Sequence, residues 1–218
     1  MAGSFLVSTT AGPLAGRAAR AATAFGRHRG FFVHAGHSQN QLARFTFAGD
    51  DDFAVFAAFE RGFQAVEPQA GAVYADITWM AFIGERPAAE HVKVWELVRD
   101  ARDVGVRTVT EAHAGRRRIE GWQVDRAVRD FVAAAGHAEH FLHRTGHSIG
   151  GSVHGDGANI DDYETHDTRE LVSGLAFSIE PGVYLQGRFG VRSELDVFLS
   201  DAGPQVYTPP QRELVKLV

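Results

Sequence analysis

The 218-residue sequence has no cysteine, which excludes a disulfide within it and excludes thiolate ligands for a metal ion. Any bound metal would be held by nitrogen and oxygen atoms, which favours hard or borderline divalent ions. No apolar run approaches the roughly 20 residues that cross a bilayer, so we expect no membrane contact. No basic groove with interleaved aromatic residues is evident, and we therefore expect no nucleic-acid partner.

Lysine and early acidic residues are also scarce. Lys93 and Lys216 stand against 20 arginines, and residues 1–49 contain five arginines and no acid, in a chain whose net charge is −5. An arginine-rich, acid-free start occurs in organelle transit segments, but nothing else in the sequence supports one, and we expect a cytoplasmic protein. An abnormal start or a shifted reading frame is another explanation of the bias.

The length fits one large domain with a substantial core. Apolar residues make up 44% and charged residues 22% of the chain, as in ordinary globular domains. Residues 1–66 have no clean periodicity, whereas the pattern sharpens from Gly71. We therefore divide the chain into a poorly readable part, 1–66, which is divergent or abnormal, and a readable domain, 67–218.

The readable part predicts helices and strands that are partly segregated along the chain. Residues 72–84 are β-branched and aromatic, which predicts a strand with Asp76 near its middle. Apolar spacing predicts one helix from Pro87, in its first turn, to Gly115, and a second helix over 121–135. Short strands are predicted over 175–179, 182–185 and 191–199. This order favours an α+β fold over a doubly wound sheet.

Asp76, Glu180 and Glu194 are isolated acids in otherwise apolar, strand-like runs. A carboxylate that points into a β core is costly unless something neutralises it, and a cation shared with His147 would do so. A metal site is therefore the first hypothesis. Taken singly, each residue has a simpler explanation: Asp76 at a sheet edge or beside a buried arginine, and His147 as a turn histidine bonded to a backbone carbonyl.

Arg192 precedes Glu194 by two residues, so the two side chains share a face if the segment is extended. One interpretation is a surface ion pair, which contributes little. The other is an arginine that supports an acid in a site. A single motif leaves structure and function open, and only the combination favours function.

The combination resembles the M24 metallopeptidases, the family of methionine aminopeptidase, aminopeptidase P, prolidase and creatinase. The similarity runs from about Gly71 to the C-terminus and is greatest to the Xaa-Pro aminopeptidase and prolidase branch. Several ordered motifs are far more specific than any one of them. These motifs are Tyr74-Ala75-Asp76-Ile77-Thr78, residues 121–132, His143-Arg144-Thr145-Gly146-His147-Ser148-Ile149-Gly150, residues 177–184 and residues 190–194.

The resemblance implies the "pita-bread" α+β fold, in which a curved antiparallel sheet with helices on its outer face holds a two-metal centre. It implies that Asp76, His147, Glu180 and Glu194 are metal ligands, with Asp76 and Glu194 bridging both ions. Mn(II) is our first choice of metal, with Co(II) and Zn(II) as alternatives. Relatives often dimerise, so a homodimer is a further expectation.

The resemblance also assigns roles around the metals. His143 and His154 match additional histidines that are thought to bind substrate and handle protons, and Arg192 matches an arginine that supports the site. Glu180 is the candidate general base. Such a centre lowers the pKa of a water molecule, polarises the scissile carbonyl and stabilises the oxyanion.

One position departs from the family pattern. The family has another metal-binding aspartate, commonly 11 residues before the one matched by Asp76, and position 65 is alanine. An insertion could bring Glu60 or Glu67 into play, although neither has the usual apolar neighbours on both sides. Because that aspartate serves one ion only, we predict one tightly held metal and a weak or empty second site.

The first choice of function is a metal-dependent aminopeptidase or dipeptidase that hydrolyses Xaa-Pro or related small amide bonds. A creatinase-like amidinohydrolase is a rival within the enzyme class, since specificity depends on loops and on further domains. The second class is a catalytically impaired descendant that binds a peptide or a protein. The missing aspartate favours this second class, and the retained site residues oppose it.

Overall fold

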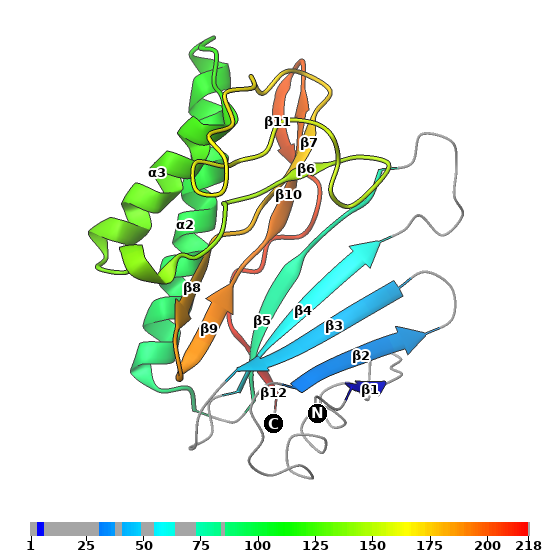
Figure 1. The fold of residues 1–218 in the computed structure, drawn as a ribbon, viewed down its shortest axis with the longest axis vertical. Coiled ribbons are helices and arrows are strands. Elements are labelled where there is room, and N and C mark those ends of the chain that lie inside the picture. Colours follow the sequence, from blue (N-terminus) through cyan, green and yellow to red (C-terminus); the bar gives the residue numbers. More distant parts are fainter. Residues whose placement is uncertain are drawn as a thin grey trace.

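The computed structural model describes residues 4–6, 31–37, 41–48, 55–63, 73–83 and 86–217. These residues form a mixed α+β structure in which two long helices lie on one side of the strands and a six-stranded sheet fans out away from them (Figure 1). None of the helices in this part of the chain has the length and apolar character that spanning a membrane requires.

The two predicted helices are present. Helix α2 spans Ala89–Ala114 and helix α3 spans Gly121–Ala134. The sequence predicted Pro87 in the first turn of α2. The N-cap of α2 is Ala88, so Pro87 instead lies just before the helix. The backbone N–H of Gly115 donates to the carbonyl of Glu111, which closes the last turn of α2. The short 3₁₀ helix η1, Ala138–His140, follows α3.

The large sheet has the strand order β1-β2-β3-β4-β5-β12. Its neighbours run antiparallel except for the outer pairs β1–β2 and β5–β12, which run parallel. The backbone register of β4 and β5 places Glu60 opposite Thr78. The strands are β1 Ser4–Leu6, β2 Phe31–His37, β3 Gln41–Ala48, β4 Val55–Phe63, β5 Thr78–Ile83 and β12 Val215–Leu217.

The remaining strands form two smaller antiparallel sheets. Their orders are β11-β10-β7-β6 and β8-β9. Their strands are β6 Ser148–Ile149, β7 Ala176–Ile179, β8 Gly182–Leu185, β9 Phe189–Arg192, β10 Leu195–Ser200 and β11 Gly203–Val206.

The strand predicted over 191–199 is wrong in one respect, because it is two strands, β9 and β10, with a break between them. The register pairs Ile179 with Leu195 and Gly182 with Arg192, so the break lies opposite the one between β7 and β8. Glu180 and Glu194 both lie in these breaks. Each acid thus sits where the ladder is interrupted and not inside a continuous strand.

Asp76 also lies outside a strand. The observed strand β5 is shorter than the strand predicted over 72–84, because it begins only at Thr78. The reason is that the Asp76 backbone N–H donates to the Asp196 carboxylate at 2.7 Å, and the Tyr74 N–H donates to the Gly150 carbonyl at 3.0 Å. The segment before β5 is therefore held by a side chain and by a loop.

The core joins the helices to the small sheets in two clusters. Both clusters use the apolar face of α2 and α3, as the helical spacing of their apolar residues predicts. One packs against β8 and β9, and the other against β7 and β10. Representative fully buried members are Val98, Val128, Val183 and Val191 in the first cluster, and Val124, Ile160, Phe177 and Val197 in the second.

Candidate metal centre

Asp76, His147 and Glu194 meet at one place although they are far apart in the sequence. Each offers a donor atom, and these three atoms lie within 4.8 Å of one another. His147 and Glu194 are buried, and the Asp76 side chain is 18% exposed. A nitrogen and two carboxylate oxygens at this spacing are a donor set that divalent ions accept.

The orientation of His147 suits a ligand. Its Nδ1 lies 3.1 Å from the Ser148 carbonyl oxygen, which can only accept, so Nδ1 carries the proton. Its Nε2 lies 3.6 Å from Asp76 Oδ2 and 3.3 Å from Glu180 Oε1. Burial opposes protonation, but Asp76, the Ser148 carbonyl and Glu194 together raise the pKa of His147. A proton and a metal ion would therefore compete for Nε2.

Glu180 lies beside this group but is not among the three mutually close ligands. Its Oε2 lies 3.3 Å from Arg192 Nη1, and its Oε1 accepts a hydrogen bond from Ser178 Oγ at 3.3 Å. Burial, together with the charge of Asp76, raises the pKa of Glu180 to about 7, although Arg192 opposes the shift. Its two oxygens thus face both His147 and Arg192.

Glu194 is nearly inaccessible, with 1% of its surface exposed. Its Oε2 accepts a hydrogen bond from Thr78 Oγ1 at 2.6 Å, and that hydroxyl in turn accepts from Arg192 Nη2 at 2.7 Å. Its Oε1 has no hydrogen-bond partner among the described residues. Burial and repulsion from Glu180 raise the pKa of Glu194 well above its ordinary value.

These observations fit a divalent cation. A buried carboxylate oxygen without a partner is costly, and three carboxylates face one another here with Arg192 as the nearby guanidinium. A cation among Asp76, His147 and Glu194 would satisfy Glu194 Oε1 and offset the repulsion. The part of the chain that the structure describes contains no second group of this kind.

His143 and His154 lie on either side of His147 in the sequence. The His143 Nδ1 lies 2.7 Å from the Arg144 carbonyl oxygen and therefore carries the proton, so Nε2 accepts from the Tyr184 hydroxyl at 2.8 Å. The exposed His154 ring lies 4.3 Å from that of His147, centroid to centroid. His154 therefore lies beside the cluster, whereas His143 contacts Tyr184.

The protonation of His143 gives a testable dependence of stability on pH. Burial, with the charges of Arg192 and Arg129, lowers the pKa of His143 to about 4. The folded state therefore disfavours the imidazolium, and this contribution to the free energy of unfolding is complete above the ordinary pKa of 6.5 and is lost as the pH falls towards 4. The full difference corresponds to about 3 kcal/mol.

We expect the wild-type chain to lose more stability than a His143→Gln variant between pH 7 and pH 4.5. Urea unfolding of both proteins in EDTA at several pH values measures this, because the difference between them isolates His143 from the other titrating groups. A constant difference across the range would contradict the assignment of a neutral His143.

Helix α3 holds the segment that carries His143 and His147. Asp125 accepts a hydrogen bond from the Thr145 backbone N–H at 3.0 Å and forms an ion pair with Arg129 at 2.8 Å. Arg129 donates to the carbonyl oxygens of Phe141 and His143. A buried acid and its arginine thus fix the chain between η1 and β6.

Gly146 allows this segment to run against β7. A Cβ atom built on Gly146 would lie 1.9 Å from the Ser178 carbonyl oxygen, which real Cβ contacts never allow. On each side, the Ser178 N–H donates to His147 O at 2.9 Å and the Glu180 N–H to Thr145 O at 2.6 Å. Only glycine permits this contact between the two backbones.

We expect Gly146→Ala to lower the free energy of unfolding by about 1–3 kcal/mol, because a backbone strand must move. Gly150→Ala is the matched control, since a Cβ there meets nothing within 4 Å, and its change should stay within about 0.5 kcal/mol. Urea unfolding compares the two, and equal effects would show that the Gly146 contact is not limiting.

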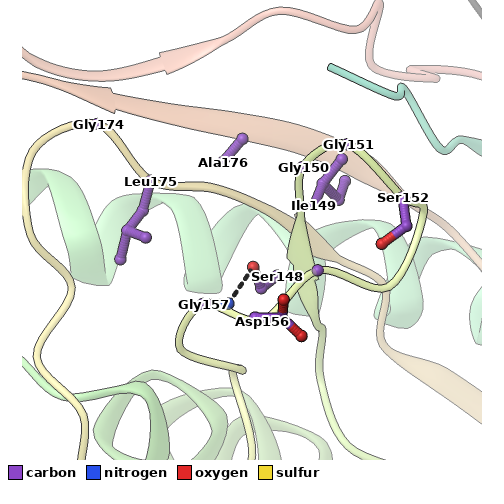
Figure 2. Close-up of a pocket in the computed structure, with 11 residues that line it drawn as sticks. Ser148, Ile149, Gly150, Gly151, Ser152, Asp156, Gly157, Gly174, Leu175 and Ala176 are labelled. Carbon is purple, nitrogen blue, oxygen red and sulfur yellow. Dashed lines mark hydrogen bonds between the residues drawn. The ribbon is translucent and has the colours of Figure 1, made fainter. Parts of the chain in front are cut away.

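The loop after β6 also lines an open pocket of about 340 Å³ (Figure 2). Ser148 Oγ accepts a hydrogen bond from the Gly157 N–H at 3.0 Å, which ties the far end of the loop to β6. None of the four predicted ligands lines this pocket. Its lining begins at Ser148, the residue after His147, but the pocket is separate from the candidate metal centre. Its lining residues are Ser148–Ser152, Gly155–Gly157 and Gly174–Ala176.

Sequence reasoning missed two residues of the site. Thr78 lies inside a motif that was noted, but its hydrogen bond to Glu194 joins residues 116 positions apart. Asp196 follows Glu194 by two residues, and the alternation of strand side chains could have placed both on one face. Ala65, which stands where the family has an aspartate, and Glu67, a candidate replacement, lie outside the described residues, as does the Glu60 side chain.

The fold and this cluster define an α+β protein with a candidate metal centre built from carboxylates and a histidine. The family model of metallopeptidase family M24 matches residues 65–201, which is more than half of the chain. The chain belongs to this family, whose members depend on divalent metals.

Individual relatives agree with this assignment. The chain is 31% identical over 149 residues to an Xaa-Pro dipeptidase of Pyrococcus horikoshii, an alignment that covers 66% of this chain and 39% of that protein. Among solved structures, a prolidase from Thermococcus sibiricus has a TM-score of 0.63 and 33% identity. The dipeptidase PepE of Mycobacterium ulcerans has a TM-score of 0.64 and 32% identity.

Both structural matches cover 75% of this chain and 40% of the other chain. The chain therefore spans less than half the length of these relatives. The matches confirm the pita-bread α+β fold that the sequence predicted. The sheet differs from the expectation in detail, since it is divided in three and contains two parallel pairs.

Proposed function

We propose that the chain is the catalytic part of a metal-dependent peptidase that cleaves Xaa-Pro or related small amide bonds in short peptides. The observation that carries the proposal is the convergence of Asp76, His147 and Glu194, with an unpartnered buried oxygen on Glu194. A divalent ion bound there supplies Lewis acidity and lowers the pKa of water. Membership of a metallopeptidase family supports the same conclusion.

The residues around the cluster have separate roles in this proposal. Glu180 faces the cluster and is the candidate fourth ligand and general base, and Arg192 holds its second oxygen in place. His143 and His154 flank the substrate and handle protons. Tyr184 donates to His143 Nε2 and so fixes the ring that faces the substrate.

The substrate class follows from the relatives and from the chemistry of proline. Relatives are named Xaa-Pro dipeptidase and prolidase. The amide before proline has no N–H, so a pocket for it needs no acceptor for that group. Imidazole rings and the Tyr184 side chain offer suitable contacts.

We also propose that the centre holds one metal ion tightly and a second ion weakly or not at all. Asp76 and Glu194, to which the family resemblance assigns contact with both ions, would be left as the main ligands of a second ion, because position 65 is alanine. Mn(II) remains the first candidate for the tight ion, since the donor set is mostly carboxylate oxygen.

Hydrolysis of Xaa-Pro dipeptides and tripeptides by the purified chain with added Mn(II) tests the function. Release of the N-terminal residue, abolished by EDTA and restored by Mn(II), is the expected result. Matched Xaa-Ala peptides report the preference for proline. Failure to cleave any of these peptides while Mn(II) is bound would contradict the proposal.

A binding module is the second candidate, and the alanine at position 65 is the observation that favours it. Such a protein would bind Xaa-Pro peptides without turnover. Calorimetric titration with the same peptides separates the two candidates, because binding with no product after prolonged incubation is expected only of the module.

A further inference from the structure

Asp196 is a buried carboxylate that the proposed chemistry does not use. It lies on β10 and none of its surface is exposed. No ion pair within 4.0 Å involves it among the described residues, and its Oδ1 has no hydrogen-bond partner there. Its Oδ2 accepts the backbone N–H of Asp76 at 2.7 Å across 120 positions of sequence.

The register explains how Asp196 reaches Asp76. Asp196 and Glu194 are two residues apart and lie on the same face, whereas the intervening Leu195 is buried in the apolar cluster behind the sheet. Asp196 pairs with Ser178 of β7, two residues before Glu180. The Asp196 carboxylate therefore points towards the segment that enters β5.

That segment is held by several contacts, one of which involves the Asp76 N–H. Asp76 lies before β5, and its N–H donates to the Asp196 side chain. The neighbouring contacts are the Tyr74 N–H on the Gly150 carbonyl, the Tyr207 hydroxyl on the Tyr74 carbonyl at 3.4 Å, and the Thr78 carbonyl, which accepts from the Glu194 N–H at 3.1 Å. The bond to Asp196 is the one made by the Asp76 N–H, on the backbone from which the Asp76 carboxylate projects.

We infer that Asp196 is a positioning residue, whose carboxylate holds the Asp76 backbone so that the Asp76 side chain reaches the metal ion. The inference rests on the proposed function, because it concerns the ligand geometry of the same site. Asp196 is not itself part of the group whose donor atoms lie within 4.8 Å. Loss of a group that orients a metal ligand typically lowers metal affinity by about 10–100-fold.

The backbone of Asp196 is anchored independently of its carboxylate. Its N–H donates to Thr208 Oγ1 at 2.7 Å, and its carbonyl accepts from the Tyr207 N–H at 3.2 Å. Truncation of the side chain therefore leaves β10 in place. Replacement by asparagine keeps an oxygen that can accept the Asp76 N–H, whereas alanine and leucine remove every acceptor.

Isothermal titration of the full chain with Mn(II) tests the inference, with folding of each variant checked by circular dichroism. We expect Asp196→Ala to weaken the affinity by about tenfold or more with unchanged stoichiometry, and Asp196→Asn to weaken it less. Asp196→Leu, which keeps the branching of the aspartate side chain at Cγ but has no acceptor, gives the same comparison where the alanine variant does not fold.

Three results would overturn the inference. An unchanged Mn(II) affinity in the folded alanine and leucine variants would show that Asp196 is structural only. An asparagine variant as weak as alanine, or a variant with fewer ions per chain, would show that its charge or direct coordination matters and not its acceptor geometry. Absence of Mn(II) binding by the wild-type chain would instead overturn the proposed function.

Discussion

Glu180→Gln is expected to lower kcat on an Xaa-Pro dipeptide by about 10²–10⁴-fold, the range that general acid–base groups contribute. Glu180 faces His147 Nε2 at 3.3 Å and is held by Arg192 at the same distance. The amide keeps the size and one oxygen of the side chain but cannot take a proton. Steady-state kinetics at saturating Mn(II) measures the effect.

Glu111→Gln is the matched control for this variant, because Glu111 is an exposed glutamate on α2 that pairs only loosely with Arg107, at 3.9 Å. It should leave kcat and KM unchanged. If Glu180→Gln retained near wild-type kcat, Glu180 would have no role as base, and the assignment of this residue would have to be withdrawn.

Glu194→Gln is expected to abolish most of the stabilisation that Mn(II) gives the wild-type chain. A ligand at 100 times its Kd stabilises a folded protein by about 2.7 kcal/mol, which for a domain of this size raises Tm by about 5–10 °C. Glu194 supplies the unpartnered buried oxygen of the cluster. Its replacement therefore removes the carboxylate that a cation would neutralise most effectively.

Thermal unfolding with Mn(II) and with EDTA measures this effect in both proteins. The glutamine can still accept the hydrogen bond from Thr78 Oγ1, so the variant should fold. Glu111→Gln again serves as the control, and its Tm should rise with Mn(II) as in the wild type. An equal rise in the Glu194→Gln variant would place the metal elsewhere.

Much of the scaffold could be predicted because its signals are local. The apolar spacing and terminal glycines of 87–115 and 121–135 predicted α2 and α3 to within two residues. The short, mainly apolar runs at 175–179 and 182–185, with turn residues beside them, likewise predicted β7 and β8. Residues near one another in sequence decide these elements, so the pattern is sufficient.

The errors at the site have a different cause. Asp76 reads as a strand residue because its neighbours are β-branched, yet its N–H is taken by Asp196, and Glu194 falls in a break that matches the break at Glu180. Thr78 bonds to Glu194 across 116 positions. Contacts between distant segments decide these features, and no local pattern encodes them.

The convergence of the four predicted ligands is the part of the site in which prediction and geometry meet. His147 lies within 4 Å of both Asp76 and Glu180, and Asp76, His147 and Glu194 form one close group. Their role as ligands stays a prediction until a metal is measured. The family resemblance supplied their identity, since each residue alone had a simpler explanation.

The most direct test is a titration of the metal-free chain with Mn(II), with the bound metal counted per chain. We predict one tightly held ion, lost in a His147→Ala variant that remains folded, and weak or absent binding of a second ion. Two equally tight ions would contradict the one-ion proposal. Binding unaffected by His147→Ala, or no binding at all, would contradict the metal centre itself.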